Sequence, residues 1–237
     1  MSRKTKIIAH RGGYGVGEFE NTIRAFERAI KIGADMIEFD IRKTDDDFLI
    51  AFHDRKVKGH EISSLSYREL SELSGKKDIP KVPEVLESTK GKIGLDIELK
   101  ETGYEDMVLG SVKKYLENDE FMVKSFQDKS VKRLKDLDPT IKAGLLLGTN
   151  TPENRIITRF SELFPVKRLD RCQADFVCPQ FNLLHLLFVK RMKKNGFEIY
   201  VWTVNEERLM RKLLKKGVDG IITDRPKIAL SYRQRFL

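Results

Sequence analysis

Cysteine is scarce in this sequence, and its two copies cannot build a zinc site. Cys172 and Cys178 have five residues between them, with neither a histidine nor a second cysteine pair close by. A structural zinc site needs four such ligands at short spacings. We therefore expect two free, partly buried thiols in a reducing compartment.

Long hydrophobic runs are also missing. The longest apolar stretch, around 183–189, contains His185 and falls far short of the roughly 20 residues that span a bilayer. The apolar run at 7–9 is too short for the core of a signal peptide, and His10 follows it at once. We expect a soluble, cytoplasmic protein.

Acidic residues are outnumbered. Lys and Arg total 45 against 36 Asp and Glu, a net charge of +9, and residues 225–237 hold four basic side chains and no acidic one. Such an excess is typical of solvated outer helix faces, and it also suits weak attraction to phosphates or to an anionic membrane. No RNA- or DNA-binding signature accompanies the charge, so no nucleic-acid partner is expected.

Short apolar runs alternate with amphipathic segments along all 237 residues. Eight strands are predicted, at Ile7–His10, Met36–Ile41, Ile93–Leu99, Phe121–Phe126, Lys142–Leu147, Asp175–Cys178, Glu198–Val204 and Gly220–Thr223. Helices are predicted between them, among them Asn21–Ile32, Met107–Leu116, Lys129–Leu137, Leu183–Lys194 and Glu206–Lys215. This alternation predicts parallel strands with helices outside.

The number of strand–helix units favours a closed α/β fold, a (β/α)8 TIM barrel, over an open doubly wound sheet. An extra run at Phe48–His53 is interpreted as a local extension of the second strand. No Pro/Gly/Ser-rich linker interrupts the chain. We expect one domain that covers residues 1–237.

The second predicted strand carries two acidic residues on one face. A strand has a side-chain period of two, so Ile37, Phe39 and Ile41 share one face while Glu38 and Asp40 share the other. The apolar face of a barrel strand must meet the helices, so the two carboxylates should point into the barrel mouth. A surface strand with a solvated face is the alternative.

The third predicted strand repeats the pattern. Its apolar residues alternate with Asp96, Glu98 and Lys100. Asp96 lies deeper on the strand than Glu98, so we expect it to serve in structural hydrogen bonding. Two strands thus direct carboxylates inward, and buried carboxylates need a cation or hydrogen-bond donors.

Charge counting predicts a metal ion. Glu38, Asp40 and Glu98 contribute three negative charges, against two positive charges from Arg11 and Lys100. A bound phosphodiester would leave the site doubly negative, and a divalent cation would neutralise it. Hard oxygen ligands favour Mg²⁺ or Ca²⁺, with Mn²⁺ also suitable.

Histidine is rare, and two of the four copies end apolar runs. His10 ends the first predicted strand and His53 ends the run at 48–53, which places both at the rim where barrel enzymes keep their chemistry. A lone histidine is more often structural, and His60 and His185 have no context that suggests otherwise.

A series of short motifs follows one order through the chain. It comprises His10-Arg11-Gly12, Glu20-Asn21-Thr22, Ala25-Phe26, Gly33-Ala34-Asp35-Met36-Ile37-Glu38-Phe39-Asp40, His53-Asp54, Ile79-Pro80, Pro83-Glu84-Val85-Leu86, Glu98-Leu99-Lys100, Val201-Trp202-Thr203-Val204-Asn205, Gly217-Val218-Asp219-Gly220 and Thr223-Asp224-Arg225-Pro226. The ordered set, which spans nearly the whole chain, resembles the glycerophosphodiester phosphodiesterase family. Any one piece would be a weak signal, whereas the ordered set is specific.

The resemblance implies a barrel whose mouth holds one divalent cation and a small phosphodiester substrate. It assigns roles to eleven residues: metal ligands Glu38, Asp40 and Glu98; an acid/base pair, His10 and His53; phosphate-binding cations Arg11 and Lys100; an aromatic pocket wall at Trp202; and supporting residues Glu20, Asn21 and Asp54. The products would be glycerol phosphate and an alcohol. Attack by a neighbouring glycerol hydroxyl, through a cyclic phosphate, and direct attack by water both stay open.

The sequence departs from the family in two places. Phe19 replaces the usual proline before Glu-Asn-Thr, and Arg55-Lys56-Val57-Lys58-Gly59 replaces the usual run after His53-Asp54. Both lie where a leaving group would be recognised. The glycine-rich stretch at 12–17 does not match a dinucleotide loop and is interpreted as a rim loop.

Two other functions are considered. A lysophospholipase D-like enzyme would use the same chemistry on a substrate with an apolar tail, and would need an exposed apolar rim near Tyr14, Phe19 or Phe181. A non-catalytic barrel that binds anions is disfavoured because the five acid/base and metal-ligand candidates are all present. The oligomeric state is left open.

Overall fold

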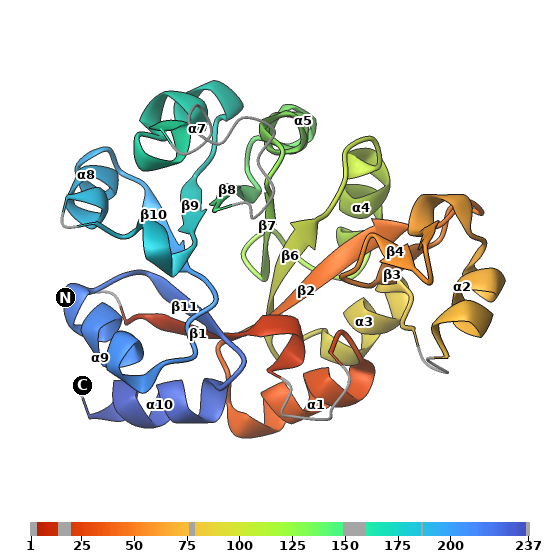
Figure 1. Cartoon of the computed structure of the whole chain (residues 1–237), viewed down its shortest axis with the longest axis horizontal. Helices are drawn as coiled ribbons and strands as arrows, with labels where there is room; N and C mark the ends of the chain where they lie inside the picture. Colours follow the sequence, from red (N-terminus) through yellow and green to blue (C-terminus); the bar gives the residue numbers. More distant parts are fainter. Residues whose placement is uncertain (1–3, 14–19, 76–78, 149–159, 186, 236–237) are drawn as a thin grey trace.

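A closed parallel barrel forms the centre of the computed structural model, which describes residues 4–13, 20–75, 79–148, 160–185 and 187–235. Its eight strands are β1 (Lys6–Ala9), β2 (Met36–Lys43), β6 (Gly94–Leu99), β7 (Phe121–Ser125), β8 (Lys142–Leu147), β9 (Phe176–Pro179), β10 (Glu198–Val201) and β11 (Gly220–Thr223). They follow the order β1-β11-β10-β9-β8-β7-β6-β2. Pairing of β1 with β2 closes the ring (Figure 1). The predicted TIM barrel is confirmed, and the open sheet is wrong.

The helices surround the barrel (Figure 1). They are α1 (Ile23–Ile32), α3 (Val82–Thr89), α4 (Glu105–Val112), α5 (Asp128–Leu137), α7 (Val166–Cys172), α8 (Phe188–Lys194), α9 (Glu207–Lys216) and α10 (Pro226–Gln234). The first of them shows how the sequence sets these bounds. The hydroxyl of Thr22 caps α1 by accepting from the backbone N–H of Ala25 at 3.2 Å. Gly33, at φ 78°, ends the helix in the left-handed conformation that glycine adopts at low cost.

Two apolar layers result from the alternation of side chains along the strands. The outward residues, such as Ile37 and Ile97, join the helices in the main core. The inward residues form a smaller cluster within the barrel: Ile8, Met36, Met122, Leu146, Phe176, Cys178, Tyr200 and Ile222. The barrel is therefore a packed core, with an apolar layer between polar groups at its two ends.

Most predicted elements agree with the structure to within a few residues, with one clear exception. The helix predicted at Leu183–Lys194 is broken: Phe181–Leu183 forms a 3-10 turn, and α8 begins only at Phe188. The backbone N–H of Phe181 donates to the carbonyl of Trp202 at 2.9 Å. This tertiary bond holds the 3-10 turn against the end of β10, so the local helical pattern is overridden.

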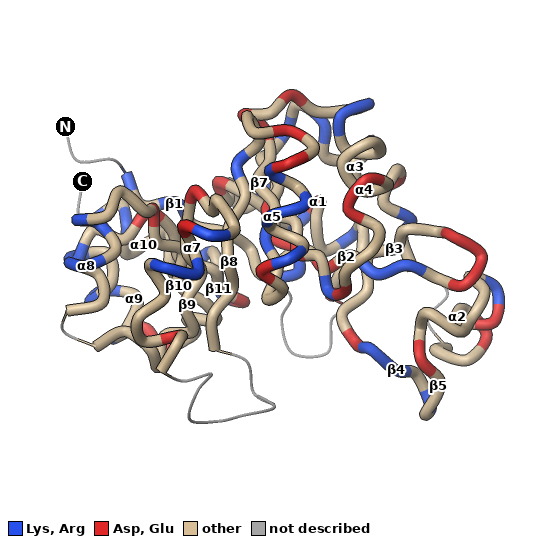
Figure 2. The backbone as a smooth tube through the Cα atoms, turned by 90° about the horizontal axis from the view of Figure 1, so that it is seen from above, with Lys and Arg blue, Asp and Glu red and all other residues tan. Residues whose placement is uncertain are grey.

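An insertion follows β2 and stands beside the barrel (Figures 1 and 2). It contains β3 (Leu49–Ala51), β4 (Lys56–Val57), β5 (His60–Glu61), a 3-10 turn (Ile62–Ser64) and α2 (Tyr67–Ser74). As predicted, the run at 48–53 extends the second strand, because β3 pairs with β2, in antiparallel orientation. The insertion has a small core of its own, formed by Ile50, Phe52, Ile62, Leu65, Leu70 and Ile79.

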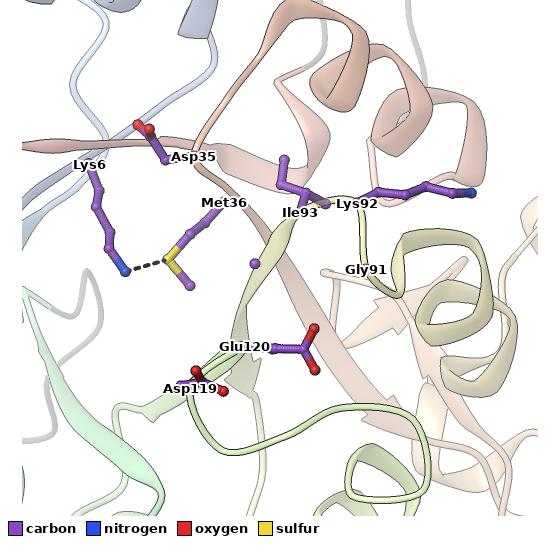
Figure 3. Close-up of a pocket in the computed structure, with 9 residues that line it drawn as sticks. Lys6, Asp35, Met36, Gly91, Lys92, Ile93, Asp119 and Glu120 are labelled. Carbon is purple, nitrogen blue, oxygen red and sulfur yellow. Dashed lines mark hydrogen bonds between the residues drawn. The ribbon is translucent and has the colours of Figure 1, made fainter.

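A hollow of about 350 Å³ lies at the amino-terminal end of the barrel (Figure 3). Lys6, Met36 and Gly94, the first residues of three neighbouring strands, line it. The Lys6 ammonium points to the Met36 sulfur at 3.7 Å (Figure 3). This end of a TIM barrel contributes to stability, whereas chemistry belongs to the opposite end. No described helix is long and apolar enough to cross a membrane.

Candidate active site

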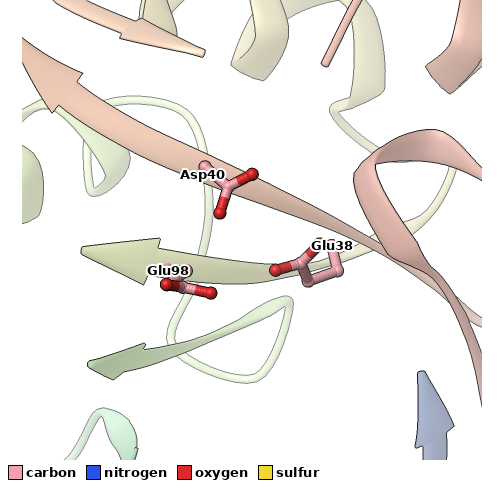
Figure 4. Close-up of side chains that lie close together, drawn as sticks. All are labelled: Glu38, Asp40 and Glu98. Atoms are coloured by element: carbon pink, nitrogen blue, oxygen red, sulfur yellow. The ribbon is translucent and has the colours of Figure 1, made fainter. Parts of the chain in front are cut away.

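Three carboxylates meet at the carboxyl end of β2 and β6 (Figure 4). Asp40 lies opposite Glu98 in the strand register. One carboxylate oxygen from each of Glu38, Asp40 and Glu98 lies within 4.8 Å of the others, and all three residues are buried. Ile37, Phe39 and Ile41 face the helices. The two-residue alternation therefore predicted the orientation of these side chains correctly.

Basic and amide groups contact each carboxylate. The backbone N–H of Arg11 donates to Glu38 at 2.9 Å, and the Asn21 amide donates to Asp40 at 2.9 Å. Lys100 reaches Asp40 at 3.1 Å and Glu98 at 2.5 Å. Burial alone would raise the pKa of Asp40, but the charges of Lys100 and Arg11 outweigh it and hold this pKa well below its usual range. Asp40 is thus ionised at neutral pH.

Lys124 is a further cation beneath the carboxylates. It is 1% exposed, and its ammonium lies 2.5 Å from Asp96 and 3.3 Å from Glu38. Burial raises the pKa of Asp96 to about 6, although Lys124 opposes the rise. Asp96 thus accepts a structural hydrogen bond, as expected from its depth on the strand. Lys124 and Asp96 add one charge of each sign, so the predicted charge balance is unchanged.

The donor set of this cluster fits a hard divalent cation. All three candidate ligands are carboxylates, and they come from two adjacent strands of a rigid sheet. Neither cysteine is part of the cluster: Cys172 and Cys178 are free thiols buried elsewhere in the core. Oxygen-only sites of this kind suit Mg²⁺, Ca²⁺ or Mn²⁺ rather than metals that prefer sulfur or imidazole.

His10 is held from behind by a carboxylate. Its Nδ1 lies 2.6 Å from Asp224 Oδ1, and its Nε2 lies 3.9 Å from Glu38 Oε2. Burial lowers the pKa of His10, but the Glu38 charge and the Asp224 hydrogen bond outweigh it, so the pKa is raised overall. The Asn205 amide donates to the other oxygen of Asp224 at 2.6 Å. His10 therefore has a fixed orientation.

The turn that follows His10 depends on glycine. Arg11 has φ 50° and Gly12 has φ 89°, and a Cβ added to Gly12 would lie 2.7 Å from the Ala25 side chain. Only glycine combines this conformation with such a close approach to α1. The turn brings the backbone N–H of Arg11 onto Glu38, and so connects the histidine to the carboxylate cluster.

His53 lies across the cavity on the insertion. Its Nδ1 is 2.8 Å from Asp54 Oδ1, and both side chains are more exposed than those of the His10–Asp224 pair. Arg42 donates twice to the His53 carbonyl, at 2.8 and 2.6 Å, and also pairs with Glu101. The insertion thus supplies the second imidazole, and Arg42 fastens it to β2.

A cavity of about 460 Å³ unites these groups. Its lining includes His10, Arg11, Glu38, His53, Asp54, Glu98, Lys100 and Trp202 from the predicted set. The indole N–H of Trp202 donates to the Cys178 carbonyl at 2.9 Å, and its ring meets Phe126 edge-on with centroids 5.6 Å apart. Trp202 and Phe126 form the apolar wall of an otherwise charged cavity.

Each of the three predicted supporting residues contacts another residue of the predicted set. Glu20 accepts from the Arg11 guanidinium at 2.8 Å, Asn21 binds Asp40, and Asp54 binds His53. Of the residues suggested for an apolar rim, Tyr14 and Phe19 lie outside the described residues. Phe181 packs against the main core and is partly buried.

Phe126 and four polar residues of the site were not predicted. Lys124 could have been found by extending the alternation to β7, where Met122 and Lys124 share the inward face. Asp224 and Asn205 lie within two of the family-like motifs, Thr223–Pro226 and Val201–Asn205, but the motifs alone do not indicate a role for them. Arg42 continues the β2 alternation after Glu38 and Asp40.

Comparison with known proteins identifies the family of this chain. Residues 10–228 match the model of the glycerophosphoryl diester phosphodiesterase family. The chain belongs to this family. The glycerophosphodiester phosphodiesterase of Caldanaerobacter subterraneus is 33% identical, over 96% of this chain and 97% of that protein.

A solved structure agrees in fold, and a human protein agrees in sequence. The crystal structure of a glycerophosphodiester phosphodiesterase from Parabacteroides distasonis is 28% identical, has a TM-score of 0.84, and covers 100% of this chain and 99% of that one. The Homo sapiens protein named Lysophospholipase D GDPD1 is 28% identical over 94% of this chain and 84% of that protein. The protein is thus an enzyme, a glycerophosphodiester phosphodiesterase that acts on small-molecule phosphodiesters.

Proposed function

We propose that this enzyme hydrolyses glycerophosphodiesters to glycerol phosphate and an alcohol with one divalent cation held by Glu38, Asp40 and Glu98. The observation that carries the proposal is the convergence of three buried carboxylate oxygens within 4.8 Å. His10 and His53 line the same cavity. Three carboxylate charges this close repel one another, and a divalent cation would offset that repulsion together with Lys100 and Lys124.

Positive groups at the site would bind the phosphate. Lys100 and Arg11 line the cavity beside the carboxylates and would stabilise charge that develops on the phosphoryl oxygens. When bound, Mg²⁺ or Ca²⁺ would add Lewis-acid polarisation of a phosphoryl oxygen. Trp202 would pack against the organic part of the substrate.

The two imidazoles would divide the proton transfers. Each has its Nδ1 on a carboxylate, Asp224 for His10 and Asp54 for His53. This arrangement fixes the ring and leaves Nε2 to exchange protons with the substrate. One histidine would accept the proton of the attacking hydroxyl or water, and the other would protonate the leaving oxygen.

The test is a panel of glycerophosphodiesters that differ in head group, assayed with Mg²⁺, Ca²⁺ or Mn²⁺ after treatment with a chelator. Turnover that requires a divalent ion and yields glycerol phosphate supports the proposal. Turnover that a chelator leaves intact contradicts the metal assignment. Release of phosphate-free glycerol would contradict the assignment of the cleaved bond.

A lysophospholipid is the second candidate substrate. The human relative named as a lysophospholipase D supports it, and so does the apolar wall that Phe126 and Trp202 give the cavity. The same residues would act on a diester that bears an acyl chain. Turnover of lysophosphatidylcholine that rises when detergent disperses the substrate would favour this candidate over water-soluble diesters.

A further inference from the structure

The three most exposed large apolar side chains in the described part of the chain lie on two segments that Arg191 connects, residues 160–164 and the start of α8. They are Phe160 (67% exposed), Leu187 (59%) and Phe164 (48%). The rings of Phe160 and Phe164 are 5.0 Å apart, and the Arg191 guanidinium lies 4.4 Å from the Phe164 ring. The backbone of Arg191 in turn bonds Leu187 at 2.9 Å. Exposed apolar side chains that adjoin in this way mark an interaction site more often than scattered ones do.

Basic residues continue this surface along α8. Leu187, Lys190, Arg191 and Lys194 follow the spacing that places side chains on one face of a helix. Lys190 and Lys194 are exposed. α8 carries four basic residues and no acidic one (Figure 2). We call the surface formed by Phe160, Phe164, Leu187, Lys190, Arg191 and Lys194 the rim patch.

The apolar part of the rim patch adjoins the mouth of the catalytic cavity. Gly148, which lines that cavity, donates its backbone N–H to the buried Glu162 carboxylate at 2.7 Å. This bond fastens the helical turn at 160–163, and with it Phe160, beside the cavity. Leu187 lies at the amino-terminal end of α8, which follows the carboxyl end of β9. The apolar part of the patch therefore lies at the catalytic end of the barrel.

We propose that the rim patch docks the enzyme on an anionic lipid surface, with the cavity mouth beside the lipid headgroups. Phe160, Phe164 and Leu187 would enter the boundary between headgroups and acyl chains, as apolar side chains of peripheral proteins do. Lys190 and Lys194 would lie over anionic headgroups, and each lysine near such a surface strengthens binding about fivefold. A partner protein is disfavoured because long lysines are costly to order in a protein interface.

The experiment is sedimentation of the full chain with vesicles of phosphatidylcholine, with and without phosphatidylglycerol, at low and high salt. We expect binding to the anionic vesicles that weakens as salt rises. A Phe160→Ser/Leu187→Ser double variant should bind about tenfold less, because insertion of the two apolar side chains is lost. A Lys190→Gln/Lys194→Gln double variant should bind about 25-fold less.

The matched control is Met107→Ser, which removes a side chain of 40% exposure from α4. It should bind vesicles like the unmodified enzyme. Circular dichroism and turnover of a water-soluble glycerophosphodiester should be unchanged in every variant, because none of the substituted residues contacts the catalytic groups. A loss of docking with intact turnover therefore separates this proposal from the proposed reaction.

Three results would overturn the docking proposal. One is the absence of binding to anionic vesicles at low salt. Another is an equal loss of binding in the Met107→Ser control. The last is a dimer in sedimentation velocity that Phe160→Ser/Leu187→Ser dissociates, since the patch would then join two copies of the chain.

Discussion

Two histidine–carboxylate pairs serve the cavity, and they share one chemistry but differ in how they are anchored. His10 and Asp224 lie at the ends of β1 and β11, and Asn205 braces the carboxylate from behind. Their side chains are 13% and 22% exposed. His53 and Asp54 belong to the insertion, and their side chains are 32% and 68% exposed.

This difference separates side chains that barrel strands hold in place from side chains that a loop holds. The strands fix His10 against the carboxylate cluster, whereas His53 depends on the grip of Arg42 on its carbonyl. One of the two expected departures from the family pattern follows directly after Asp54. We infer that the barrel pair sets the chemistry and that the insertion pair also adapts to the leaving group.

The largest effect is expected from removal of either histidine, which tests whether both pairs take part in the reaction. His10→Ala and His53→Ala should each lower kcat at least about 100-fold, the usual contribution of a positioned acid or base. His60→Ala, on the same insertion but outside the cavity lining, is the control and should retain normal turnover. Near-normal turnover in either cavity variant would remove that histidine from the mechanism.

Substitution of the two histidine-bound carboxylates, Asp224 and Asp54, should lower kcat to different extents. Asp224→Asn should lower kcat about 10- to 100-fold, because a partly buried, braced partner is lost, and Asp54→Asn less than about fivefold, because water can replace an exposed one. Asp224 raises the pKa of His10, so this pKa falls in Asp224→Asn. The limb of the pH profile that His10 governs should therefore move to lower pH. Equal losses in the two variants would refute the difference in anchoring.

Arg42 should act through His53. Arg42→Ala should lower kcat/KM about tenfold, because the His53 backbone loses two hydrogen bonds. In the His53→Ala background the same substitution should have little further effect, since residues that act as a unit are not additive. A full additional loss in that background would show instead that Arg42 contacts the substrate.

The smallest expected effect is the reaction of the two cysteine thiols with a disulfide reagent. Burial raises the pKa of Cys172 to about 11, and it also raises the pKa of Cys178. Because only the thiolate is reactive, neither thiol should react with a disulfide reagent near pH 8 in the native enzyme, and both should react in denaturant. Fast reaction of one thiol in the folded enzyme would show that the core opens near it.

The elements that depend on local pattern were predictable from the sequence. Glu38, Asp40 and Glu98 follow from the two-residue period of β2 and β6, and the order of the motifs gave the family. The pairing of His10 with Asp224 joins residues 214 positions apart and arises only when β1 and β11 close the barrel. The break before α8 likewise depends on a tertiary bond, from Phe181 to Trp202, that no local pattern encodes.

The central claim, one divalent cation on three carboxylates, is tested most directly by calorimetric titration of the chelator-treated enzyme with Mg²⁺, Ca²⁺ and Mn²⁺. We predict a single binding site per chain that Glu38→Gln, Asp40→Asn or Glu98→Gln each removes, while Asp106→Asn, which alters an exposed carboxylate on α4, leaves it intact. The claim would be contradicted if none of the three ions bound, or if binding survived in all three cluster variants.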